Sequence, residues 1–161
     1  MKDYIQLQKD DVLRLGIKDS EGNDTGEHLE FNLSDIELPL RYQELVDKNK
    51  KNRQFLKNQF VIIEKREDVK GKKLLSKNEE DKIKAINEFF KKEVEIYNMF
   101  LGENGVEKLL NGRKLGWTSL QEIDDIIEKQ IMPHIDLTME KITKKVKEKY
   151  GAPEEEQEVL K

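Results

Sequence analysis

The residue types that most often carry out chemistry are few in this chain and lie far apart. There is no cysteine, and the two histidines are His28, at an expected strand edge, and His134, directly after a proline. A nucleophile needs a base within hydrogen-bonding reach, and neither histidine has a recognisable partner. Two isolated histidines are also a poor zinc-ligand set. We therefore predict no catalytic residue, no metal ligand and no cofactor-binding residue.

Acidic residues and glycines give no clearer chemical motif. Neighbouring carboxylates, such as Glu93 with Glu95 or Asp124 with Asp125, have the spacing of a solvent-exposed helix. We expect no acid to interrupt a strong apolar helix face. Three glycines between residues 102 and 112 do not follow the GxxxxGK[ST] order of a phosphate-binding loop. These observations predict a protein that is not an enzyme.

Two segments have the residue types of a protein-binding surface. Asn49, Asn52 and Arg53 interrupt an apolar helix stripe where burial should be strongest, which indicates a poorly buried face or a polar partner. Residues 101–117 join two expected helices through glycine-containing loops, and exposed apolar loop residues usually have a binding role. The candidate partner-binding residues are Asn49, Asn52, Arg53, Leu101, Val106, Leu109, Leu110, Arg113, Lys114, Leu115 and Trp117.

Composition indicates one domain with long, solvated helices. The chain has 161 residues, of which 35% are hydrophobic and 40% are charged, far above the usual quarter. The N-terminus has no apolar run, and no stretch approaches the roughly 20 apolar residues of a membrane span. We expect a cytoplasmic protein with no membrane partner.

Charge is distributed unevenly along the chain. Residues 1–40 carry four basic and ten acidic side chains, whereas residues 47–73 carry ten basic and four acidic ones. Regions of opposite sign can attract further copies of the chain or a polar partner, and the alternative is a solvated surface with no partner. The net charge of −4 and the absence of a recognition motif argue against nucleic-acid binding.

The first third of the sequence has the pattern of β-strands. Apolar side chains alternate with polar residues or glycine from Leu13 to Ile17 and again from Leu29 to Leu33. Residues 5–7 indicate a third strand. The nine residues DSEGNDTGE, which favour turns, separate the two clear strands. A hairpin or meander of this kind must pack against the helices to be stable.

Three Ser/Glu pairs have the spacing of a capping box, in which a serine side chain and a glutamate three residues later bond each other's backbone amides. The pairs are Ser34 with Glu37, Ser76 with Glu79, and Ser119 with Glu122. Pro39 suits a first helical turn, whereas Pro133 is predicted to break or kink the third helix, with a restart at Asp136 or Thr138. The longest apolar stripe consists of Ile83, Ile86, Phe90, Val94 or Glu93, Tyr97 and Leu101.

Together these patterns predict an α+β fold that is mainly α. An N-terminal antiparallel β-hairpin or meander (1–35) is followed by a helical domain (36–150), with a long αα-hairpin and further C-terminal helices. Residues 151–161 are predicted to be a disordered acidic tail. The whole chain forms one domain.

Two stretches carry a resemblance to a known family. With FNLSDIELPLRYQELVD at the first helix start, and EIYNMFLGENGVEKLLNGRKLGW followed by EIDDIIEKQIMPHI, the chain resembles the tail assembly chaperones of long-tailed (siphovirus-type) phages and prophages of Gram-positive bacteria. The resemblance extends over residues 1–150 and contains no catalytic signature.

This resemblance implies a non-enzymatic protein that binds the tape-measure protein and recruits tail-tube subunits during tail assembly. Many copies would act together, and head-to-tail contacts between copies would give a ring or a spiral. The alternatives are a structural subunit of a phage or prophage particle, whose hairpin adds to a neighbour's sheet, and a helical nucleic-acid or regulatory adaptor.

Overall fold

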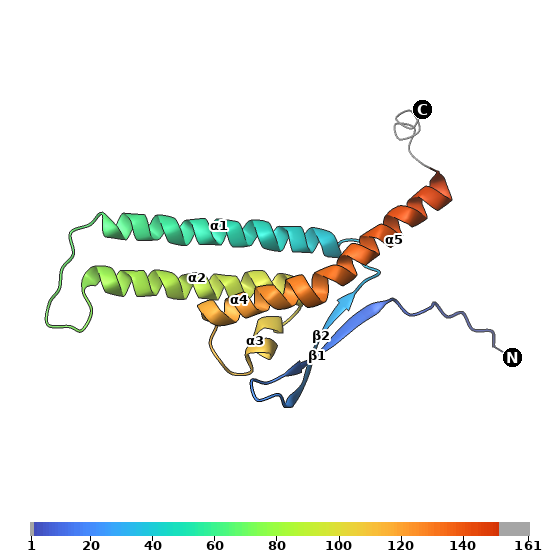
Figure 1. The fold of residues 1–161 in the computed structure, drawn as a ribbon, viewed down its shortest axis with the longest axis horizontal. Coiled ribbons are helices and arrows are strands. Elements are labelled where there is room, and N and C mark those ends of the chain that lie inside the picture. The colour runs from blue at the N-terminus through green and yellow to red at the C-terminus, as the bar shows by residue number, and fades with distance from the viewer. Residues whose placement is uncertain (1, 152–161) are drawn as a thin grey trace.

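The computed structural model describes residues 2–151 and confirms the predicted α+β, mainly helical fold (Figure 1). The expected tail lies outside the described residues, apart from Gly151. A β-hairpin is followed by two long antiparallel helices, a short helix and a C-terminal helical rod. The elements are β1 (Val12–Lys18), β2 (Asp24–Asn32), α1 (Leu38–Glu64), α2 (Lys77–Leu101), α3 (Gly105–Leu110), α4 (Trp117–Ile126), η1 (Ile127–Ile131) and α5 (Met132–Tyr150).

The sheet has two strands, so the hairpin is present and the third strand indicated by residues 5–7 is wrong. Leu13 pairs with Phe31 and Leu15 with Leu29, which places alternate side chains on the face that covers the helices. Residues 2–11 form no strand. The connecting loop is shorter than predicted because β2 already begins at Asp24, and the Asp19 carboxylate holds the turn by accepting the backbone amides of Glu21 and Asn23.

The two long helices form the predicted αα-hairpin. The capping box of Ser76 and Glu79 is formed at the start of α2. At the start of α1 the box predicted from Ser34 and Glu37 is not formed, because the Ser34 hydroxyl accepts the backbone amide of Asp11 instead. Pro39 does lie in the first turn.

The helix at residues 117–150 runs through Pro133 without a break. The helix begins at Trp117, two residues before the predicted start, and Ser119 Oγ accepts the backbone amide of Gly116. Proline has no amide hydrogen, and its ring collides with the carbonyl four residues earlier in a regular α-helix. The chain relieves this conflict with a π-helical turn, η1, in which the Met132 amide donates to the Ile127 carbonyl. The predicted restart at Asp136 or Thr138 is therefore wrong.

The core lies where the hairpin, the N-terminal part of α1 and the C-terminal part of α2 meet. Phe100 packs against both Phe31 and Tyr42, with ring centroids 5.5 and 5.7 Å apart. The buried side of α2 is rotated from the predicted stripe, since Ile83 is exposed and Phe89, Glu93 and Ile96 are buried. Within residues 2–151, no helix combines the length and apolar character that crossing a membrane requires.

Candidate functional site

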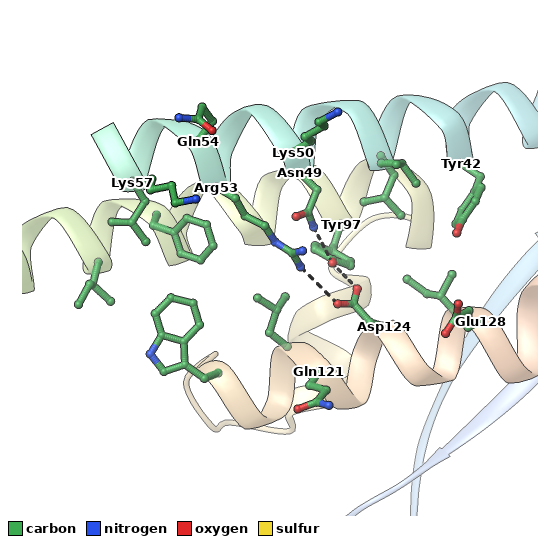
Figure 2. A pocket seen from close by; sticks show the side chains of 18 of the residues that line it. Tyr42, Asn49, Lys50, Arg53, Gln54, Lys57, Tyr97, Gln121, Asp124 and Glu128 are labelled. Carbon is green, nitrogen blue, oxygen red and sulfur yellow. Dashed lines mark hydrogen bonds and ion pairs between the residues drawn. The ribbon is translucent and has the colours of Figure 1, made fainter. Parts of the chain in front are cut away.

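A groove of about 1300 Å³ lies between α1 and α4, with α2 at its base (Figure 2). Its α1 wall extends from Tyr42 to Phe60 and its α4 wall from Trp117 through Glu128 of η1. α2 contacts both walls, because it bonds Asn49 and Asn52 of α1 and Asp124 of α4. The apolar lining residues are Leu45, Val46, Leu56, Phe60, Ile86, Phe89, Leu120 and Ile127.

A buried polar cluster of Asn49, Asn52, Glu93 and Tyr97 joins α1 to α2 beneath the groove. The Asn49 amide donates to Glu93 Oε2 at 3.2 Å and to the Tyr97 hydroxyl at 2.7 Å. The Asn52 amide donates to Glu93 Oε1 at 3.3 Å and to the Phe89 carbonyl at 3.1 Å. Each carboxylate oxygen of Glu93 therefore has an amide donor, which compensates for the loss of water on burial.

This cluster reaches the groove through Tyr97. The Tyr97 hydroxyl donates to Asp124 Oδ1, and the Arg53 guanidinium lies 3.6 Å from Asp124 Oδ2 across the groove (Figure 2). Asn49 and Asn52 thus meet a polar partner, as one interpretation of the sequence expected, but the partner is within the same chain. Arg53 remains exposed at the groove wall, whereas the two asparagines are buried.

Burial changes the acidity of two groups in the cluster. Burial raises the pKa of Glu93 to about 7, although the Asn52 hydrogen bond and Arg53 lower it. Burial, with the hydrogen bond to Asp124, also raises the pKa of Tyr97. A carboxyl group with a pKa near neutrality resembles a general base, but Glu93 has no exposed surface. A substrate would reach it only after the helices separate.

The two walls of the groove carry opposite charge. Lys50, Arg53 and Lys57 line the α1 side, and Asp124 and Glu128 line the opposite side. Apolar side chains lie between the two charged rims. A groove with this cross-section matches an amphipathic helix, whose apolar stripe is bordered by charged residues.

The segment at residues 101–117 contributes less exposed apolar surface than the sequence predicted. Leu101, Val106 and Leu110 are buried in the core, so the prediction that they are available to a partner is wrong in this fold. Leu109 and Leu115 are half-buried against the same core. These five side chains fix α3 against α2 and β2.

Other predicted residues of this segment remain exposed. Arg113 and Lys114 lie on the surface of the loop before α4. Trp117 lines the groove and stacks on Phe89 and Phe90, with ring centroids 5.4 and 4.7 Å apart, while 56% of its surface stays exposed. Asn49, Arg53 and Trp117 are therefore the predicted residues that the structure brings to one groove.

Sequence reasoning missed the acids and one amide that organise the site. Glu93 and Asp124 were both expected on solvated faces, yet Glu93 is fully buried and Asp124 bonds Tyr97. Asn98 also has an unpredicted role, because its Oδ1 accepts the Val106 amide at the start of α3. The sequence did contain a signal for this cluster. Asn49 and Asn52 interrupt an apolar face of one helix, and Glu93 occupies an apolar stripe position of the next helix, so these polar residues could be expected to bond one another.

The histidines form no site with other residues. His28 lies on the hairpin beside Arg14 and Glu30, and His134 is exposed at the start of α5. In the described residues there is no group of three or more histidine or acidic side chains placed to hold a metal ion.

No protein-family model, no curated protein and no solved structure matched the chain.

Proposed function

We propose that the chain is a tail assembly chaperone of a long-tailed phage or prophage, and that it holds a helical segment of the tape-measure protein in the groove between α1 and α4. The protein would then act in the bacterial host cytoplasm and bind other proteins without catalysing a reaction. Tail-tube subunits would be its later partners.

One observation carries the proposal, namely the helix-sized groove with an apolar base and charged walls of opposite sign. A tape-measure protein is long and helical, so it can offer many amphipathic segments to many copies of the chain. Each contact can be weak, because several linked contacts strengthen one another. The resemblance of residues 1–150 to tail assembly chaperones gives independent support.

Co-expression with the tape-measure protein encoded in the same gene neighbourhood tests this proposal. We expect the full chain to keep that protein soluble and to co-purify with it. Val46→Asp places a charge in the groove and should reduce co-purification by about tenfold or more, a cost of about 1.4 kcal/mol. Val61→Asp is the matched control, because Val61 lies outside the groove lining on the same helix and has nearly the same exposure, 46% against 47%.

The outcome against the proposal is equally specific. A tape-measure protein that stays insoluble with the wild-type chain, or equal loss of binding in Val46→Asp and Val61→Asp, would show that the groove is not the site.

A structural subunit is the second candidate because the hairpin leaves both strand edges unpaired in residues 2–151. Such edges can pair with a strand from another protein. In that case the chain would remain in purified tail particles. We expect a chaperone to be absent from them, and mass spectrometry of assembled tails separates the two functions.

A further inference from the structure

The outer half of α5 carries an apolar stripe that nothing in the described part of the chain covers. The stripe begins at the buried Ile135 and continues at helical spacing through Met139, Ile142, Val146 and Tyr150. Ile135 is 2% exposed and Ile142 is half-buried, whereas Met139, Val146 and Tyr150 are 40%, 50% and 80% exposed. An uncovered apolar stripe on an amphipathic helix usually marks a surface that binds another protein.

The groove of the same copy cannot receive this helix. α5 continues directly from α4 and η1 and leads away from the bundle past the start of α1 (Figure 1). A continuous helix cannot fold back on its own preceding turns. The groove of a second copy is long enough, since its α1 wall from Tyr42 to Phe60 extends about 28 Å and the uncovered part of α5, from Met139 to Tyr150, extends about 18 Å.

The charges beside the stripe match the walls of the groove. On one side of the stripe α5 presents Lys145 and Lys149, and on the other side it presents Asp136 and Glu140, followed by Lys147. With the stripe along the groove mouth, outside the Arg53–Asp124 ion pair that crosses it, Lys145 and Lys149 face Asp124 of α4 and Glu128 of η1. The acids then face Lys50, Arg53 and Lys57 of α1.

From the stripe, its length and its charges, we propose that α5 of one copy docks in the α1–α4 groove of a second copy and occupies it until the helix of the partner displaces it. Displacement of α5 by a tape-measure helix rests on the proposed function, because both helices would bind the same groove. The contact between two copies does not require the tape-measure protein.

The contact joins two different surfaces, so each copy that donates α5 still has an empty groove. Such heterologous contacts extend from copy to copy into an open or ring-shaped assembly. A pair of α5 helices docked on each other would instead close at two copies.

Sedimentation velocity of the full chain tests the contact through two variants and two controls. We expect the wild type to self-associate and both Val46→Asp, in the groove, and Val146→Asp, on the stripe, to be monomeric. Leu137→Asp is the matched control on α5, because Leu137 is 55% exposed against 50% for Val146 and lies on the opposite side of the helix. Val61→Asp is the matched control on α1. Both controls should behave as wild type, and circular dichroism verifies that all four variants fold.

Mixing the two monomeric variants gives the sharpest result. Val46→Asp retains an intact α5 and Val146→Asp retains an intact groove, so a 1:1 mixture should form a dimer and nothing larger. A monomeric wild type, self-association that survives Val46→Asp, or a mixture without dimer would overturn the proposal. Failure of the proposed function is separable, because Val146→Asp keeps the groove and should still bind the tape-measure protein if that function holds.

Discussion

At the scale of single residues, Glu93 is an acid at a position where helix packing normally requires an apolar side chain. Its oxygens are satisfied by Asn49 and Asn52, so removing one amide would leave part of the carboxylate buried without a donor. Asn49 Oδ1 is itself buried without a partner in the described residues.

The raised pKa of Glu93 predicts how stability depends on pH. Folded Glu93, with a pKa near 7, retains its proton at pH values where the unfolded side chain, with an ordinary pKa of 4.5, has lost it. The folded state therefore binds more protons, and its free energy of unfolding should fall by about 2 to 3 kcal/mol from pH 5 to pH 8. Urea unfolding followed by circular dichroism across this range measures the change.

Glu93→Gln should remove most of this slope, because glutamine does not titrate. Glu95→Gln is the control, since Glu95 is exposed on the same helix and should leave the slope unchanged. Asp35, Asp68 and Asp81 do not interfere, because hydrogen bonds lower the pKa of each and their contributions are lost only at lower pH. A wild-type slope equal to that of Glu93→Gln would contradict the assignment.

At the scale of elements, two serines with the same sequence spacing to glutamate behave differently. Ser76→Ala should lower the free energy of unfolding by about 1 kcal/mol, because Ser76 Oγ accepts the Glu79 amide at the start of α2. Ser34→Ala should cost clearly less, since its hydroxyl accepts an exposed amide outside α1. Chemical denaturation of both variants measures the difference, and equal losses would refute the distinction.

The elements that the sequence predicted are those whose signals are local. Strand alternation and the Ser76 box depend on neighbouring residues and both were confirmed, whereas the buried side of α2 is rotated from the predicted stripe. The predicted box at Ser34 failed because Asp11, 23 residues away, supplies the competing amide. The burial of Glu93 likewise depends on α1, which lies far away in the sequence, and the effect of Pro133 depends on a π-helical turn that no spacing rule indicates.

The candidate site could be predicted only in part for the same reason. Arg53 and Trp117 were identified as exposed side chains with a possible partner, and both line the groove. Leu101 and Val106 were selected as apolar residues expected to be exposed, yet both are buried, and a Cβ at Gly105 would lie 2.6 Å from the Leu101 Cβ. A groove between three helices exists only once their packing is set.

At the scale of the whole molecule, the basic region of the sequence at residues 47–73 contributes one charged wall of the groove, whereas the acidic region at residues 1–40 contributes none of its lining acids. The basic residues of α1 form one wall of the groove, and acidic residues of α4 and η1 form the other. α5 carries an apolar stripe with charges in the complementary order away from the body (Figure 1). One chain therefore carries both the α5 stripe and the α1–α4 groove, but its own α5 cannot reach its own groove.

Trp117 gives a direct signal from this contact, because it is the only tryptophan in the chain and lines the groove. A helix that docks beside it would exclude water from the exposed part of the indole. We expect its fluorescence emission to shift to shorter wavelength as the wild-type concentration rises, and to remain constant in monomeric Val146→Asp, whose groove is intact but stays empty. Leu137→Asp should follow the wild type, because its stripe is unchanged. Emission that is independent of concentration while sedimentation shows assembly would mean that copies associate through another surface.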